Sequence, residues 1–126
     1  MSTNLPILDD FKKAIERLEE VLNLEKTDIT RDSAIKRFEI CFDLAWKTIK
    51  EQAKKQGVEC NSPRICFKTA FQLKLIDYDD EWLNMIDDRN LTTHLYKEEY
   101  ADKVYSHLKS YLGLFKKLKN TISQEI

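Results

Sequence analysis

The sequence contains only two glycines and two prolines among 126 residues, so it lacks the turn-forming residues that a many-stranded sheet requires. Apolar residues make up 42% of the chain and charged residues 34%, a balance that favours amphipathic helices. No apolar run approaches the roughly 20 residues of a membrane-spanning helix, and the N-terminus does not resemble a signal peptide. We therefore expect one domain, residues 1–126, that does not enter a membrane.

An excess of charge of one sign is also missing. Lys and Arg total 21 against 22 Asp and Glu, so no overall field draws the chain onto nucleic acid, and any contact with RNA must be local. Residues 77–88 include six acids and no basic residue. We expect these carboxylates to be solvated, because adjacent ones such as Asp87 and Asp88 point about 100° apart on a helix and cannot readily share a metal ion.

Cysteine is scarce, since Cys41, Cys60 and Cys66 are odd in number and show no C-x-x-C spacing. We expect three reduced thiols, buried as small apolar groups, in a cytoplasmic protein. A metal site would need distant histidines to complete it, so no metal is expected. Glycine-rich phosphate loops and the G-x-S-x-G element of hydrolases are absent, and no cofactor is expected.

Apolar residues recur instead every three or four positions, as in helices with one buried face. This spacing predicts helices over about residues 8–22 and, after a polar segment at 25–30, up to Gly57, a residue suited to a left-handed cap. The core face of the second helix carries Ala34, Phe38, Cys41, Phe42, Ala45 and Ile49. Off this face, Ile40 and Leu44 indicate either a wider buried surface or a contact with another subunit.

Three more helices are predicted in the C-terminal half. Ser62 as N-cap and Pro63 at the first position open a short helix that reaches about Leu75. Asp79 or Asp80 caps the next helix, and the last helix covers about residues 100–118. Together these elements predict an all-α fold, an antiparallel up-and-down bundle of four or five helices.

The decapeptide DDRNLTTHLY, residues 87–96, concentrates polar side chains suited to phosphodiester chemistry. His94 can exchange a proton with a ribose 2′-OH or a leaving oxygen near neutral pH. Arg89 can clamp the phosphate, and Asn90 can orient the phosphate or the imidazole, without a metal ion. On one continuous helix Arg89 and His94 would point about 140° apart, so they converge only if the helix ends between them or if two chains pool their residues.

The two threonines between Arg89 and His94 are poor helix formers whose hydroxyls can cap a chain end, which favours a break there. A structural interpretation stays open beside the catalytic one. In it, Arg89 pairs with an acid such as Asp87 or Asp88 of a neighbouring turn or subunit, and His94 packs at a helix end.

The segment RNLTTH, with Arg89, Asn90 and His94, resembles the R-x4-6-H motif of the HEPN superfamily. Tyr96 extends it to R-x4-H-x-Y, which resembles the HEPN toxins encoded beside a minimal nucleotidyltransferase. The stretches AIKRFEICFDLAWKTIKEQAKKQG and YADKVYSHLKSYLGLFKKL resemble the bacterial nucleotidyltransferase substrate-binding proteins, a branch of HEPN, and the likeness runs from about Leu8 to Leu118.

This resemblance implies a helical homodimer with a cleft built from the Arg and His of both chains, and a minimal nucleotidyltransferase as partner. It further implies the toxin half of a toxin–antitoxin pair, a metal-independent endoribonuclease that is neutralised when nucleotides are added to Tyr96. Arg89, Asn90 and His94 are then the catalytic residues. The alternative is a non-catalytic subunit that presents the transferase with its substrate, and a third is a purely structural dimer.

Overall fold

The computed structural model describes residues 5–125 and is built from five α-helices and one short 3-10 helix. These elements are α1 (Pro6–Leu22), α2 (Asp28–Lys55), α3 (Pro63–Gln72), α4 (Glu81–Leu91), η1 (Thr92–His94) and α5 (Glu98–Glu125). Over this range the structure has no strand, and the predicted all-α bundle is confirmed. Within residues 5–125, no helix has both the length and the apolar character needed to cross a membrane.

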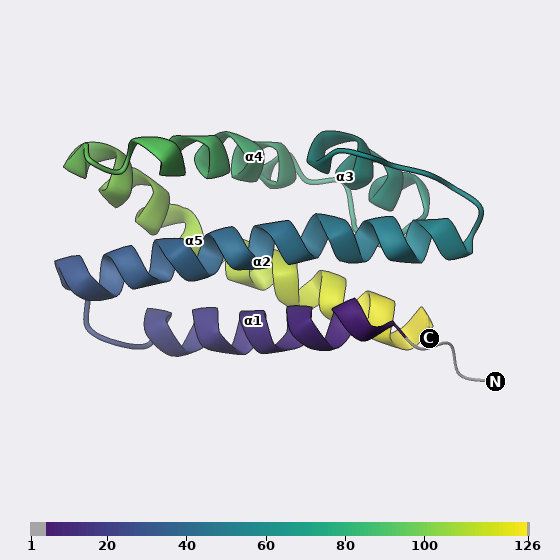
Figure 1. Cartoon of the computed structure of the whole chain (residues 1–126), viewed down its shortest axis with the longest axis horizontal. Coiled ribbons are helices and arrows are strands. Elements are labelled where there is room, and N and C mark those ends of the chain that lie inside the picture. The colour runs from purple at the N-terminus through teal and green to yellow at the C-terminus, as the bar shows by residue number, and fades with distance from the viewer. Residues whose placement is uncertain (1–4, 126) are drawn as a thin grey trace.

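The long helix α2 lies in the middle of the bundle (Figure 1). Helix α1 runs back along one side of it, the shorter α3 and α4 follow one another along the other side, and α5 crosses behind. Aromatic side chains in the core join all five helices. The ring pairs are Phe11–Phe115, Phe38–Tyr111, Phe42–Phe67, Phe67–Trp82 and Trp82–Phe115.

Local hydrogen bonds set the helix ends. Helix α2 begins at Asp28, inside the segment expected to be a polar break, because Thr27 and Thr30 form a reciprocal capping box. At its other end Gly57 has a φ of 79°, so the predicted left-handed cap is confirmed. Ser62 Oγ accepts a hydrogen bond from the Ile65 amide at 3.3 Å, as predicted for an N-cap.

Two predicted helix ends need adjustment. Helix α3 stops at Gln72, three residues before the expected end, and Lys74 then turns the chain with a φ of 61°. Helix α5 continues to Glu125, one and a half to two turns beyond the predicted end at residue 118, because Ile122 is fully buried and extends the apolar face. Of the two candidate caps of α4, Asp79 accepts a hydrogen bond from the Glu81 amide at 2.9 Å.

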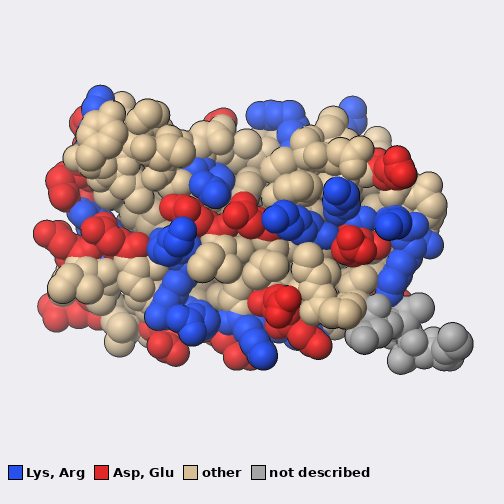
Figure 2. Space-filling model, in the orientation of Figure 1, with Lys and Arg blue, Asp and Glu red and all other residues tan. Residues whose placement is uncertain are grey.

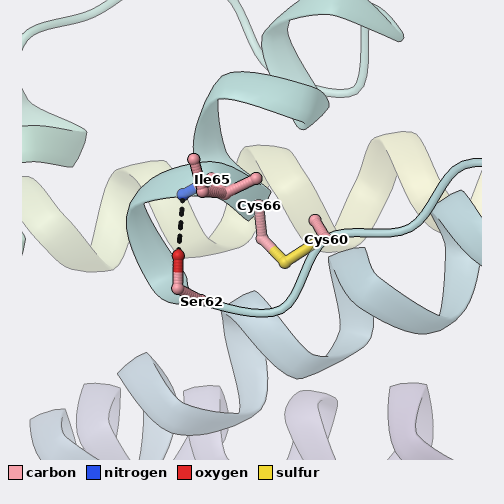
Figure 3. The surroundings of a disulfide bond; sticks show 4 residues. All are labelled: Cys60, Ser62, Ile65 and Cys66. Atoms are coloured by element: carbon pink, nitrogen blue, oxygen red, sulfur yellow. Dashed lines mark hydrogen bonds between the residues drawn. A yellow bond between two sulfur atoms is a disulfide. The ribbon is translucent and has the colours of Figure 1, made fainter.

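The prediction of three reduced cysteines is wrong for two of them. Cys60 and Cys66 form a disulfide that ties the segment before α3 to the first turns of that helix (Figure 3). The turn at Ser62 and Pro63 brings their Cα atoms to 5.1 Å, a closeness that their spacing in the sequence does not reveal. Cys41 is a free, buried thiol, as expected.

Candidate functional site

Helix α4 ends at Leu91, between Arg89 and His94, as predicted from the two threonines at positions 92 and 93. Thr92 Oγ1 donates to the Arg89 carbonyl at 2.6 Å, and Thr93 Oγ1 donates to the Asn90 carbonyl at 3.0 Å. The Thr92 amide also bonds to both of these carbonyls, so each hydroxyl adds a second donor at the end of the helix, and the chain continues through η1 before α5 begins. The predicted break between Arg89 and His94 is therefore confirmed.

Arg89 lies half-buried at this break, against α2. Its Nη1 donates to Thr92 Oγ1 at 3.0 Å, while Nη1 lies 3.7 Å from Glu39 Oε2 and Nη2 lies 3.6 Å from Asp43 Oδ2. Its Nε is buried and has no hydrogen-bond partner among residues 5–125. Within the chain Arg89 pairs with acids of α2 rather than with Asp87 or Asp88, and these pairs are too long to be direct hydrogen bonds.

His94 and Tyr96 lie together on the exposed side of the break. The Tyr96 hydroxyl is 3.5 Å from His94 Nδ1, the two rings meet edge to face at 6.0 Å, and 78% of Tyr96 is exposed. Asn90 is exposed, and its side chain has no hydrogen bond within the described range. In this part of the chain no hydrogen bond or ion pair joins Arg89 to His94, so the structure brings His94 to Tyr96 and leaves Arg89 on the α2 side.

A buried arginine that the sequence reasoning missed anchors the chain just after the motif. Arg31 of α2 is 4% exposed, and its Nη1 lies 2.5 Å from Glu98 Oε2 and 3.2 Å from Asp102 Oδ1, both in the first turns of α5. Hydrogen bonds from Lys26 and Arg31 lower the pKa of Asp102, and bonding to Glu98 raises the pKa of Arg31. Arg31 falls on the same helical stripe as Ala34, and this signal could have identified it.

A second polar cluster corrects the expectation that the acids of residues 77–88 are all solvated. Asp88 is buried, and its Oδ2 accepts from the Tyr111 hydroxyl at 2.5 Å and lies 2.7 Å from His107 Nδ1. Burial, and then the bond with Asp88, raise the pKa of Tyr111. His107 and Lys103 also line an open cavity of about 280 Å³.

The sequence could not reveal this cluster, because Asp88 and its two partners on α5 are 19 and 23 residues apart. Adjacent positions on α4 then have opposite roles: Asp88 is held inside by α5, while Arg89 turns toward α2. Among the described residues, no three His, Cys, Asp or Glu side chains are grouped so as to hold a metal ion.

Comparison with solved structures places the fold among known proteins. A crystal structure of a protein from Thermus thermophilus is 34% identical, with a TM-score of 0.78, over 86% of this chain and 94% of that one. The Haemophilus influenzae protein HI0074 has the same fold, with 22% identity and a TM-score of 0.83 over 92% of this chain and 98% of that one. Its structure is described as the fold of a substrate binding domain of a nucleotidyltransferase.

Sequence comparison gives a consistent result. A curated Haemophilus influenzae protein named probable ribonuclease HepT is 27% identical over 84 residues, which are 63% of this chain and 58% of that protein. The family model described as nucleotidyltransferase substrate binding protein like matches residues 7–124. The resemblance read from the motif and the flanking helices is thereby confirmed, and the chain belongs to the nucleotidyltransferase substrate binding protein like family.

Proposed function

We propose that this protein is a metal-independent endoribonuclease, the toxin half of a pair whose other half is a minimal nucleotidyltransferase. The observation that carries the proposal is the helix break between Arg89 and His94. It leaves the His94 imidazole exposed. Within residues 5–125 the Arg89 guanidinium meets opposite charge in two ion pairs, at 3.7 Å and 3.6 Å. Such a guanidinium retains the capacity to bind a phosphate in a fork.

The chemistry uses the RNA's own nucleophile. His94 removes the proton from a ribose 2′-OH, the 2′-oxygen forms a bond to the adjacent phosphorus, and the bond from phosphorus to the 5′-oxygen breaks. A protonated imidazole returns the proton to that leaving oxygen, so the products are a 2′,3′-cyclic phosphate and a 5′-hydroxyl. Arg89 stabilises the charge that develops on the phosphoryl oxygens, and Asn90 orients the phosphate or the imidazole.

The active unit in this proposal is a homodimer. Two histidines from two chains can then serve as base and acid, and each Arg89 can face the His94 of the other chain. Ile40, 44% exposed, and the half-buried Leu44 lie on the same helix as Glu39 and Asp43, and supply an apolar surface for the contact. Light scattering at micromolar concentration should give twice the chain mass, and a monomer would oppose this part of the proposal.

A second candidate function is a subunit without catalysis that presents a nucleotidyltransferase with its substrate. The family description and the description of HI0074 favour it. The acids beside Arg89 also favour it, because Glu39 and Asp43 repel the backbone of RNA. In both proposals a nucleotidyltransferase is the partner, and they differ in whether the chain alone cleaves RNA.

The deciding experiment incubates the purified chain with total RNA in EDTA and compares it with the His94→Ala variant. Cleavage that persists in chelator, leaves cyclic phosphate ends and is lost in His94→Ala supports the ribonuclease. Lys97→Ala is the matched control, because Lys97 is an exposed residue three positions away in the same connection. Equal cleavage by His94→Ala and the unaltered chain would refute the mechanism, and no cleavage by either favours the substrate-presenting subunit.

Expression in cells provides a second readout. Induction of this chain alone should arrest growth, and co-expression of the partner nucleotidyltransferase should relieve the arrest. Growth that is unaffected by the chain alone would contradict the role of toxin.

A further inference from the structure

A pocket of about 310 Å³ lies between α3, the segment 73–80 and α4, at the end of α4 away from the motif. The buried rings of Phe67 and Trp82, 4.8 Å apart, form part of its lining. Phe71 and Tyr78 contribute two more rings, which meet edge to face at 5.6 Å. Almost all of the pocket's exposed lining is apolar, which is the character of sites that hold flat organic molecules.

The outer rings of this pocket are exposed to an extent that folding does not explain. Phe71 is 46% exposed, Tyr78 is 73% exposed, and Leu83 on the pocket's α4 side is also exposed. If these side chains belonged to the core, they would be buried. Each large apolar side chain that stays in water loses about 1.5–3 kcal/mol of the stabilisation that burial would give. Exposed aromatic side chains around a concavity are characteristic of a binding surface.

The charges at the pocket differ between its sides. Arg64 and Lys68 are exposed and one turn apart on α3, and within residues 5–125 neither has an ion pair or a side-chain hydrogen bond. Figure 2 shows basic side chains projecting at the top of the molecule, over α3. On the other side two acids are already engaged: Asp79 accepts from the Glu81 amide, and Asp80 accepts from the Tyr78 hydroxyl at 2.8 Å.

We propose that this pocket binds a nucleotide, with the base against Phe71 and Tyr78 and the phosphate on Arg64 and Lys68. Every base has a π-face that stacks on aromatic rings, and an Arg and a Lys one turn apart provide the positive charge that a phosphate requires. The volume suits one base with its sugar rather than an interface between proteins, which is flat and much larger. The carboxylate of Asp77 lines the pocket and has no hydrogen bond or ion pair within residues 5–125, which favours a base that carries an exocyclic amino group, such as adenine.

This inference goes beyond the proposed ribonuclease, because the pocket shares no residue with Arg89, Asn90, His94 or Tyr96. The two places lie at opposite ends of α4, on the order of 15 Å apart for a helix of that length. The nucleotide can come from two sources, a free mononucleotide or an unpaired nucleotide of an RNA strand. The shared chemistry is a base joined to a phosphate.

Calorimetric titration of the full chain with AMP, adenosine, inorganic phosphate and a short single-stranded adenine oligonucleotide tests the proposal. AMP should bind, adenosine should bind at least about tenfold more weakly, and inorganic phosphate should give no saturable signal. If AMP and the oligonucleotide bind equally per site, the pocket accepts a nucleotide from either source. Tighter binding of the oligonucleotide would identify RNA as the source, and binding of AMP alone would identify a free nucleotide.

Variants locate the binding. Phe71→Ala and the Arg64→Glu/Lys68→Glu pair should each weaken AMP binding by about tenfold or more. Ile29→Ala and Lys54→Glu are the matched controls, since both residues are exposed and lie on α2 outside the pocket. Thermal melts confirm that the variants are folded, which is expected because the altered side chains are exposed.

The His94→Ala variant separates the two proposals, because it should lose RNA cleavage and keep AMP binding. No binding of AMP or of the oligonucleotide at millimolar concentration would overturn the pocket proposal. AMP binding of equal affinity in the Phe71→Ala variant and in the control variants would overturn it too.

Discussion

Arg89 and Asp43 face each other from α4 and α2 with 3.6 Å between Nη2 and Oδ2, and no hydrogen bond closes the gap. Glu39 lies at a similar distance from the same guanidinium. If Arg89 clamps a phosphate, both acids compete with the ligand for its charge. Both pairs are longer than a hydrogen bond and only partly buried, so their removal should cost about 1 kcal/mol at most and leave the fold intact.

We therefore expect Glu39→Gln and Asp43→Asn each to tighten RNA binding by about two- to fivefold. Glu51→Gln is the control, because it removes the same charge from an exposed position of α2. Binding is measured with the His94→Ala protein so that the RNA stays uncut. Equal affinities in all three variants would mean that Arg89 does not contact the phosphate.

We expect the partner nucleotidyltransferase to transfer one or more AMP units from ATP to the Tyr96 hydroxyl, with release of one pyrophosphate for each unit. The Tyr96 hydroxyl lies 3.5 Å from His94 Nδ1 and the residue is exposed, so an added phosphate would place negative charge at the catalytic imidazole and would exclude RNA. Intact-mass spectrometry should show the addition, and Tyr96→Phe should remain unmodified and toxic. Modification that persists in Tyr96→Phe but is lost in Tyr100→Phe or Tyr105→Phe would assign the acceptor elsewhere.

Arg31 is expected to hold the beginning of α5 in place. Arg31→Met leaves the carboxylates of Glu98 and Asp102 without their buried partner, and should lower the free energy of unfolding by about 2–3 kcal/mol. Amide hydrogen exchange should accelerate at Lys97, Tyr100 and Ala101, whose amides are hydrogen-bonded at this connection. Arg17→Met, at an exposed position of α1, should change neither quantity, and an unaltered exchange rate in Arg31→Met would show that the network does not anchor α5.

The Tyr111 hydroxyl is expected to stabilise the buried Asp88. Tyr111→Phe removes a donor 2.5 Å from Asp88 Oδ2 and should cost about 2 kcal/mol in urea denaturation, because hydrogen bonds to charged groups are the stronger ones. Tyr105→Phe is the matched control on the same helix, with an expected change within about 0.5 kcal/mol. Equal stabilities of the two variants would indicate that His107 alone satisfies the carboxylate.

Thiol chemistry should distinguish the three cysteines. In denaturant without reductant, one thiol should react with an alkylating reagent, because Cys60 and Cys66 are joined in a disulfide. After reduction all three thiols should react. In the folded protein Cys41 should alkylate slowly at pH 8, since burial raises the pKa of its thiol to about 12. Replacement of both Cys60 and Cys66 by Ala should cost about 2 kcal/mol for so short a loop. Three reactive thiols in the unreduced, denatured chain would contradict the disulfide.

The sequence by itself determined the features that depend on neighbouring residues. Gly57, the Ser62 cap and the break at the two threonines before His94 were all predictable, because each rests on hydrogen bonds or backbone conformations within about four residues. The apolar periodicity likewise determined the helices and the core face of α2, since burial follows the 3.6-residue period.

Only the tertiary structure decided which polar groups meet across the bundle. The partners of Arg31 on α5 lie 67 and 71 residues away in the chain, and Asp88 meets His107 across 19 residues, so no local pattern encodes these contacts between helices. The direction of Arg89 was decided in the same way, by the acids that α2 happens to place opposite it. Periodicity shows that a side chain faces a neighbouring helix, but the identity of the group it meets depends on how the helices pack.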